Sequence, residues 1–244
     1  MKYALTAIAI GLTLASAVKV RAQDAQAKAA ETRLHEDWAW MARYAEANAA
    51  LPAPTRQRVV LIGDSITQGW YDMVPEFFAG DRVGRGIGGQ TTPQMLVRFR
   101  QDVIALRPAV VQIMAGTNDI ASNTGPMTVE QTQANIMSMA ELARLHGIRV
   151  ILASIPPADH FPWRPGLSTA PEIAAINAWM KGYAARTGAV YADYWTALHD
   201  GDALRAAYTY DGVHPNKAGY AAMAPVANAA IRKALAAPAP APKP

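Results

Sequence analysis

Two distant points of the chain carry the residue types that acyl transfer requires. Ser65 closes a Gly-Asp-Ser turn directly after the apolar run 58–62, which places its hydroxyl at the end of a predicted strand. A serine hydroxyl is a weak nucleophile until a base takes its proton. His214 is the candidate base, and Asp211, three residues earlier in a tight turn, can orient the imidazole ring from the same side. These residues predict a Ser–His–Asp catalytic triad.

Acyl transfer also needs hydrogen-bond donors for the negatively charged oxygen of the tetrahedral intermediate. We predict three such donors: the backbone N–H of Ser65, the backbone N–H of Gly89 and the side-chain amide of Asn118. Gly89 lies in the glycine-rich segment 84–89, and Asn118 follows a strand-like run. The loss of one such donor typically lowers the rate by about 10²–10³-fold.

The elements that must position these residues alternate along the chain. Apolar runs predict strands at 58–62, 82–83, 109–114, 148–154 and 189–193, and helical periodicity predicts helices at 92–106, 128–146, 172–187 and 216–236. This alternation favours a parallel sheet that is covered by helices on both faces. Each candidate residue follows a strand, and the carboxyl ends of parallel strands share one edge, where ligands bind. We therefore expect the candidates to meet at that edge.

Four segments together resemble the SGNH (GDSL) hydrolase family, of the bacterial secreted esterase/lipase type. They are Gly-Asp-Ser at 63–65, the bend that ends at Gly89, Gly-Thr-Asn-Asp at 116–119 and Asp-Gly-Val-His-Pro at 211–215. The resemblance implies a flavodoxin-like three-layer α/β/α sandwich with about five parallel strands. It also implies a serine esterase in which Ser65, Gly89, Asn118 and His214 are the family residues and Asp211 completes the triad. The sequence departs from the family at Gly84, where asparagine often stands.

Aromatic and acidic residues near these segments have expected roles of their own. Trp70, Trp163 and Tyr210 are candidate substrate contacts, because an aromatic ring at the rim could stack on a sugar or on an aryl leaving group. Asp64 and Asp119 flank the candidate catalytic groups, and we expect them to accept hydrogen bonds from backbone amides and to hold the loops. Small acyl esters, such as acetyl esters of carbohydrates or aryl alcohols, are therefore the expected substrates.

Composition argues against several other kinds of site. The chain has no cysteine, which excludes disulfides, a thiolate nucleophile and a cysteine-ligated metal. The remaining histidines, His35, His146, His160 and His199, lack paired metal-ligand spacing. No basic stripe of the kind that binds nucleic acid is visible. We therefore expect no metal, no cofactor and no nucleic-acid partner, and a small-molecule or carbohydrate ester as substrate.

Residues 1–22 have the pattern of a cleavable signal peptide. Lys2 precedes the apolar run 3–18, and small residues at positions 20 and 22 suit a signal peptidase. The run is shorter than the roughly 20 apolar residues that span a bilayer, which favours a secreted or periplasmic protein over a stable membrane anchor. With cleavage after Ala22, 23 basic residues become 20 against 19 acidic ones, so the formal net charge falls from +4 to +1.

The rest of the chain divides into three parts. Residues 23–57 are expected to form an N-terminal helix and a linker, with Leu34, Trp38 and other apolar residues of 25–51 facing a core. Residues 58–236 form the expected hydrolase domain. Residues 237–244 are expected to form a disordered, unpacked Ala/Pro tail.

Other functions use parts of the same pattern. An α/β-hydrolase needs Gly-x-Ser-x-Gly after several strands, but here Thr67 replaces the second glycine and one strand precedes the serine. A non-catalytic flavodoxin-like domain could bind a phosphate at residues 65–69, but Asn118 and His214 would then have no role. An acyltransferase with the same triad remains an alternative, as does lysophospholipase or thioesterase activity on longer acyl chains.

Overall fold

The five apolar runs of the sequence form one parallel sheet. In the computed structural model, which describes residues 24, 25, 27–29 and 31–241, the strands are β1 (Val59–Gly63), β2 (Arg82–Gly86), β3 (Val110–Met114), β4 (Arg149–Ala153) and β5 (Val190–Ala192). The strand order is β2-β1-β3-β4-β5, and all neighbouring strands are parallel. This is the flavodoxin-like order, so the predicted fold class is confirmed.

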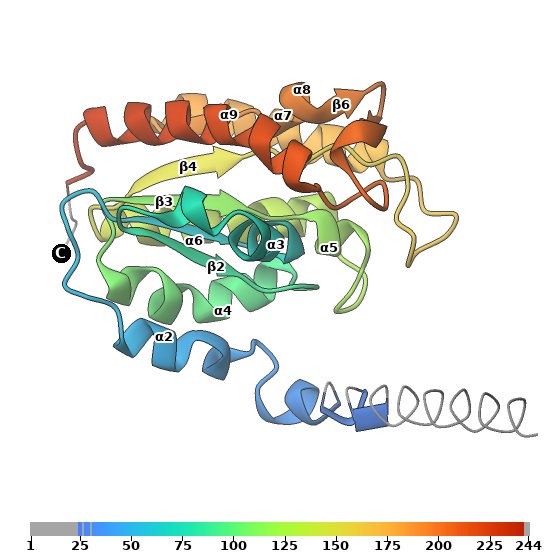
Figure 1. Ribbon diagram of the computed structural model, residues 1–244, viewed down its shortest axis with the longest axis horizontal. Coiled ribbons are helices and arrows are strands. Elements are labelled where there is room, and N and C mark those ends of the chain that lie inside the picture. The colour runs from blue at the N-terminus through green and yellow to red at the C-terminus, as the bar shows by residue number, and fades with distance from the viewer. Residues whose placement is uncertain (1–23, 26, 30, 242–244) are drawn as a thin grey trace, which may run out of the picture. The chain divides into compact units, whose positions relative to one another are not determined.

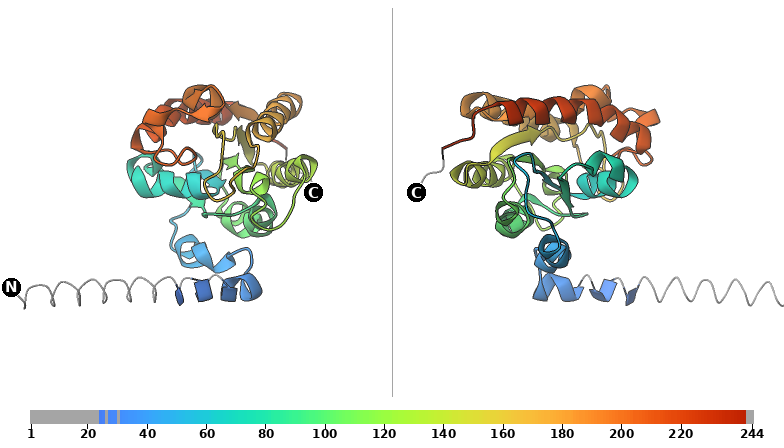
Figure 2. Two further views of the ribbon diagram at one scale, coloured as in Figure 1. Left: turned by 90° about the vertical axis from the view of Figure 1, so that its right-hand side faces the viewer. Right: turned by 60° about the vertical axis from the view of Figure 1, so that its left-hand side comes forward.

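Helices cover both faces of this sheet, as Figures 1 and 2 show. The longer covering helices are α3 (Ser65–Met73), α4 (Thr92–Asp102), α6 (Val129–Leu145), α7 (Ala170–Thr187) and α9 (Lys217–Ala236). The described chain also contains the short helices α2 (Ala45–Ala49), α5 (Thr117–Ile120) and α8 (Tyr194–Leu198). Successive strand residues point to opposite faces. Val60 and Ile62 therefore pack against α4, α6 and α7, whereas Val59 and Leu61 pack against α3, α8 and α9.

Short 3-10 turns and a hairpin occur between the longer elements. The turns are η1 (Met41–Tyr44), η2 (Pro75–Phe78), η3 (Ile104–Leu106) and η4 (Ala206–Tyr208), and the hairpin pairs β6 (His199–Asp200) with β7 (Ala203–Leu204). The predicted helix at 92–106 ends at Asp102 and continues as η3. Helices α3, α5 and α8 were not predicted from the sequence, because a glycine or short length obscures their helical periodicity.

One buried arginine joins the end of β1 to the loop that follows β2. The Arg98 guanidinium is fully buried and donates to the Gly63 carbonyl at 3.0 Å, to Gln90 Oε1 at 2.6 Å and to Asp102 Oδ2 at 3.1 Å. Asp102 also accepts a hydrogen bond of 2.7 Å from Asn48 of α2. Buried charges are stable only when they are paired and hydrogen-bonded. This network therefore fixes where the Gly89 loop lies relative to β1.

Packing explains why Gly84 stands where the resembled family often has asparagine. A Cβ atom at Gly84 would lie 2.9 Å from Cδ2 of Tyr71 and 3.2 Å from Cε1 of Phe78. A side chain such as asparagine would therefore displace these aromatic rings. The close approach of α3 and η2 to β2 requires glycine at this position.

The described residues up to Arg43 form a separate unit. The prediction of a single helix over 25–51 is wrong, because the helix is interrupted. The described residues 24–36 are helical, but Trp40 has φ 53°, in the left-handed region, and a new turn begins at η1. Asp37 caps that turn, since its carboxylate accepts hydrogen bonds from the N–H groups of Met41 and Ala42. Leu34 is 53% exposed and Trp38 37% exposed, so the expected core-facing stripe does not form.

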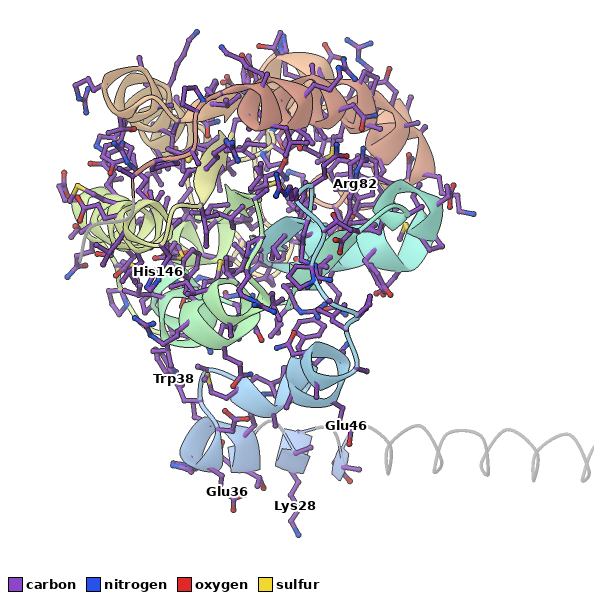
Figure 3. The ribbon with its side chains drawn as sticks, turned by 90° about the vertical axis from the view of Figure 1, so that its left-hand side faces the viewer. Lys28, Glu36, Trp38, Glu46, Arg82 and His146 are labelled. Carbon is purple, nitrogen blue, oxygen red and sulfur yellow. The ribbon has the colours of Figure 1, made fainter. Side chains whose placement is uncertain are left out.

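Charged side chains also lie on the surface of this unit. The side chains of Lys28 and Glu36 point outward from the helical segment (Figure 3). The predicted signal peptide, residues 1–22, lies outside the described residues. Among the described residues, no helix combines the length and the apolarity that crossing a membrane requires.

The described part of the C-terminal tail contacts the domain. The Ala237 carbonyl accepts a hydrogen bond of 2.7 Å from Arg149. Pro240 is half-buried, and together with Leu96, Leu142 and Tyr183 it lines a cavity of about 910 Å³. Ala237 and Pro240 therefore contact the domain, contrary to the prediction of an unpacked tail, whereas Pro238 and Ala239 are exposed. Arg149 supplies a donor for the chain as it leaves α9. Residues 242–244 lie outside the description.

Candidate active site

The expected triad residues meet at the carboxyl edge of the sheet. Ser65 Oγ lies 2.9 Å from His214 Nε2, although the two residues are 149 positions apart in the chain. His214 Nδ1 lies 2.7 Å from Asp211 Oδ2. A hydroxyl, an imidazole and a carboxylate in this order can transfer a proton from the serine to the histidine. The arrangement can therefore generate a serine nucleophile.

The 211–214 turn holds the histidine ring through both carboxylate oxygens of Asp211. Oδ2 accepts from the ring, while Oδ1 accepts from the backbone N–H groups of Val213 at 3.0 Å and His214 at 2.8 Å. Partial burial of Asp211 tends to raise its pKa, but the hydrogen bonds from His214 and Val213 outweigh burial, so the pKa lies below its ordinary value. Asp211 is thus an anion at neutral pH, which suits a partner for an imidazolium ion.

Ser65 is the first residue of α3, and its backbone N–H has no intrahelical acceptor for that reason. Asp64 caps this helix, since its Oδ1 accepts from the Ile66 N–H at 2.9 Å. The Ser65 side chain is half-buried. The N-terminus of a helix favours negative charge nearby. Both features suit the Ser65 N–H to stabilise an oxyanion.

The other two candidate donors lie on the loops after β2 and β3. Gly89 is exposed with φ 77°, a conformation that favours glycine, and among the described residues no protein acceptor is recorded for its N–H. Asn118 is buried in α5, and its Nδ2 donates to the Gln90 carbonyl at 3.1 Å. The Asn118 amide is therefore oriented by the same loop that carries Gly89.

Asp64 and Asp119 support these loops as expected. The Asp119 carboxylate accepts from the Thr92 N–H at 3.1 Å and from the Thr92 hydroxyl, which ties α5 to the start of α4. Burial raises the pKa of Asp119 above its ordinary value, although the Thr92 hydrogen bonds oppose the shift. Burial also raises the pKa of Asp64 from 3.8 to about 6, opposed by the Ile66 N–H and by His214. The hydrogen bonds of both carboxylates support a role in holding the loops, and no acid or base role needs to be assigned to either one.

The raised pKa of Asp64 predicts a pH-dependent stability. The folded protein favours the protonated carboxyl, so this stabilisation is complete below about pH 4 and is lost as the pH rises through about 6. Asn at this position remains neutral and can still cap α3. We therefore expect the Asp64→Asn variant to lose less stability than the wild type between about pH 4 and 6.

Thermal unfolding at pH 4, 5, 6 and 7 measures this difference. The Asp202→Asn variant is the matched control, because Asp202 is exposed on the β6–β7 hairpin and no contact of its side chain is recorded. Identical pH dependence of the Asp64→Asn variant and the wild type would contradict the assigned pKa.

Trp70, predicted as a substrate contact, is a core residue instead. Its side chain is fully buried, 4.3 Å from the ring centroid of Phe77 and 5.6 Å from that of Tyr220. The prediction is wrong because Ser65 starts a helix rather than a loop, and this helix turns Trp70 toward α9. The Tyr220 hydroxyl also donates to the Ile66 carbonyl at 2.9 Å, which fixes α3 against α9.

Trp163 and Tyr210 do lie beside the histidine. Their ring centroids are 6.0 Å and 5.8 Å from that of His214, and the two side chains are 39% and 62% exposed. Trp163 also stacks on the buried Phe161 at 5.1 Å. His160 borders the same region, because its ring would lie 3.1 Å from a Cβ atom at Gly212. Both predicted aromatic residues are therefore accessible next to the candidate base.

Two residues near the donors were not found from the sequence. Gln68 Oε1 accepts from the Gly88 N–H at 2.8 Å, and Asn123 Nδ2 donates to the Gly89 carbonyl at 3.3 Å. Gln68 lies three residues after Ser65, so its place in the sequence could have indicated that it lies near the site. No local sequence pattern marks Asn123. Among the described residues, no group of three or more histidine, aspartate or glutamate side chains could hold a metal ion.

Comparison with known proteins gives matches over most of the described chain. The model of the GDSL-like lipase/acylhydrolase family matches residues 61–222. A crystal structure of a proposed acylhydrolase from Bacteroides fragilis is 48% identical, with a TM-score of 0.80, and covers 82% of this chain and 100% of that one. A GDSL-like lipase from Bacteroides thetaiotaomicron is 46% identical, with a TM-score of 0.78, over 81% of this chain and 100% of that one.

A similarity to curated bacterial proteins is more limited. Esterase TesA of Pseudomonas aeruginosa is 31% identical over 112 residues, which are 41% of this chain and 54% of the esterase. The chain spans about half the length of the curated relatives that it matches, 48% and 54%.

Proposed function

Because the chain belongs to the GDSL-like lipase/acylhydrolase family and is an SGNH-type ester hydrolase, we propose that it cleaves short-chain carboxylic esters through an acyl-enzyme on Ser65. Acetyl esters of carbohydrates or of aryl alcohols are the proposed substrates. The observation that carries this proposal is the unbroken chain of contacts from Asp211 through His214 to Ser65, at 2.7 Å and 2.9 Å.

The proposed reaction has two stages. His214 Nε2 takes the proton of Ser65 Oγ as that oxygen attacks the ester carbonyl carbon, and Asp211 stabilises the imidazolium that forms. The carbonyl oxygen becomes negatively charged and accepts hydrogen bonds from the three predicted donors. The intermediate then expels the alcohol, which receives its proton from His214. In the second stage water attacks the acyl-enzyme, and His214 takes a proton from that water. The bond from the acyl carbon to Ser65 Oγ then breaks, His214 returns the proton to Oγ, and the acid leaves.

The two exposed aromatic rings support an alcohol part that is a sugar or an aryl group. Trp163 and Tyr210 flank His214, which protonates the leaving alcohol in this mechanism. Aromatic rings offer a rigid apolar face of the kind on which such a ring can stack. Trp70 contributes nothing to this contact, because it is buried.

We expect kcat/KM on nitrophenyl esters to be highest for acetyl and to fall by about tenfold or more toward lauroyl, because a small acyl site rejects additional methylenes. The measurement compares acetyl, butyryl, octanoyl and lauroyl esters, and it also follows acetate release from acetylated sugars. The Ser65→Ala variant serves as the blank for spontaneous hydrolysis. Maximal activity on the lauroyl ester would contradict the short-acyl proposal and favour a lysophospholipase or thioesterase.

The acyltransferase alternative differs only in what attacks the acyl-enzyme. A sugar hydroxyl would replace water, and the same triad would serve both reactions. Product analysis with an acetyl donor and a free sugar separates the two. Free acetate as the main product supports the hydrolase, and an acetylated sugar as the main product contradicts it.

A further inference from the structure

One exposed amide, that of Asn123, connects three groups around the active site. Its Nδ2 donates to Asn118 Oδ1 at 2.8 Å and to the Gly89 carbonyl at 3.3 Å. Its Oδ1 accepts from the indole N–H of Trp163 at 3.3 Å. Its backbone N–H also donates to the Asn118 carbonyl at 3.0 Å. Asn123 therefore contacts both loops that carry predicted oxyanion donors and the aromatic ring beside His214.

The indole of Trp163 determines which way the Asn123 amide faces. An indole nitrogen can only donate a hydrogen bond, so the atom of Asn123 that faces it must be the oxygen. The NH₂ group of Asn123 then faces Gly89 and Asn118. Both partners there are oxygen atoms, which can only accept. A flipped Asn123 amide would place donor against donor at Trp163 and oxygen against oxygen at Gly89.

The orientation of the Asn118 amide follows from that of Asn123. Its Oδ1 accepts from the NH₂ group of Asn123, so its Nδ2 is the other terminal atom of the amide, the one that does not face Asn123. There it donates to the Gln90 carbonyl at 3.1 Å and lies 3.5 Å from Asp64 Oδ2. Asn118 is buried, so a flipped amide would lose these bonds and leave buried polar atoms without partners, which is costly. The donor atom of Asn118 thus depends on Asn123 for its direction.

We propose that Asn123 is a positioning residue for the oxyanion donors. Its side-chain amide, which is oriented by the indole N–H of Trp163, orients the amide of Asn118 and the peptide at Gly89. The inference rests on the proposed esterase function, because it concerns the donors of that site. It assigns Asn123 no contact with the reacting atoms. It also joins the loop of Trp163 to the two loops of the oxyanion donors.

The central experiment measures kcat and KM on nitrophenyl acetate for Asn123→Ala in two backgrounds. In the wild-type background we expect kcat to fall by about tenfold with little change in KM, since misdirecting one donor costs less than the 10²–10³-fold of losing it. In the Asn118→Ala background the same change is expected to lower kcat by less than about threefold, because residues that act through one another are not additive.

A second variant tests the role of the indole without truncating Asn123. Trp163→Phe keeps an aromatic ring and removes the N–H that orients the amide. We expect it to lower kcat, and we expect Asn123→Ala combined with Trp163→Phe to be no slower than Asn123→Ala alone. Asn228→Ala is the matched control, because Asn228 is a half-buried residue of α9 for which no side-chain hydrogen bond is recorded, and its kcat should equal that of the wild type.

The outcomes separate this inference from the proposed function. If wild-type protein releases nitrophenol in a burst and Asn123→Ala has the wild-type kcat, the positioning role is wrong and the esterase stands. An equal loss in both backgrounds would show that Asn123 acts independently of Asn118, which also overturns the inference. A wild-type protein without turnover would overturn both. If Asn123→Ala unfolds at the assay temperature, the Trp163→Phe variant alone tests the positioning role. An unchanged kcat of Trp163→Phe would then contradict the proposal.

Discussion

The Ser65→Ala variant is expected to lower kcat on nitrophenyl acetate by about 10⁶-fold and to form no acyl-enzyme. The variant has no oxygen for the acyl group, and the remaining donors alone support only slow hydrolysis by water. Within the part of the chain that the structure describes, the Ser65 hydroxyl hydrogen-bonds His214 alone, and alanine is well tolerated in a helix. The unfolding temperature should therefore change little.

Intact-protein mass spectrometry after mixing with the ester tests this result directly. Wild-type protein should show an acetyl adduct and a burst of nitrophenol, and the variant should show neither. Ser138→Ala is the matched control, because the Ser138 hydroxyl donates to the Ala134 carbonyl within α6, away from the candidate active site. Turnover of Ser65→Ala comparable to that of Ser138→Ala would refute Ser65 as the nucleophile.

The Asp211→Asn variant is expected to lower kcat by about 10⁴-fold. The amide can present an NH₂ group to His214 Nδ1, which would then have to be the acceptor. The single proton of the neutral ring would lie on Nε2, where it prevents His214 from taking the Ser65 proton. The other atom of the amide can still accept from the N–H groups of Val213 and His214, so the turn is retained. Thermal stability should change far less than activity.

Kinetics at several pH values and thermal unfolding together check this expectation. The Asp202→Asn variant is again the control, since it makes the same chemical change at an exposed residue. Unchanged turnover in Asp211→Asn would remove Asp211 from the proposed triad. A large loss of stability that accounts for the loss of turnover would instead assign Asp211 a structural role in the turn.

The sequence alone determined the sheet, the covering helices α4, α6, α7 and α9, and the edge at which the candidate residues lie. Strands that are buried on both faces form continuous apolar runs, and amphipathic helices repeat every 3.6 residues, so both leave a local pattern. The pattern predicted β1 within one residue and α6 and α9 within two, and the order of strands and helices implied a common carboxyl edge. Ser65 and His214 could therefore be expected to meet there, and they lie 2.9 Å apart.

The tertiary structure alone decided the direction in which individual side chains point. Trp70 packs against Tyr220, which is 150 residues away, and the tail contacts Arg149 on a distant strand. Asn123 has its role only because loops from three parts of the chain bring Gly89, Asn118 and Trp163 to it. Periodicity reports which face of an element is apolar. It carries no information about which distant residue meets that face, because partner choice depends on packing and on hydrogen-bond geometry in the folded chain.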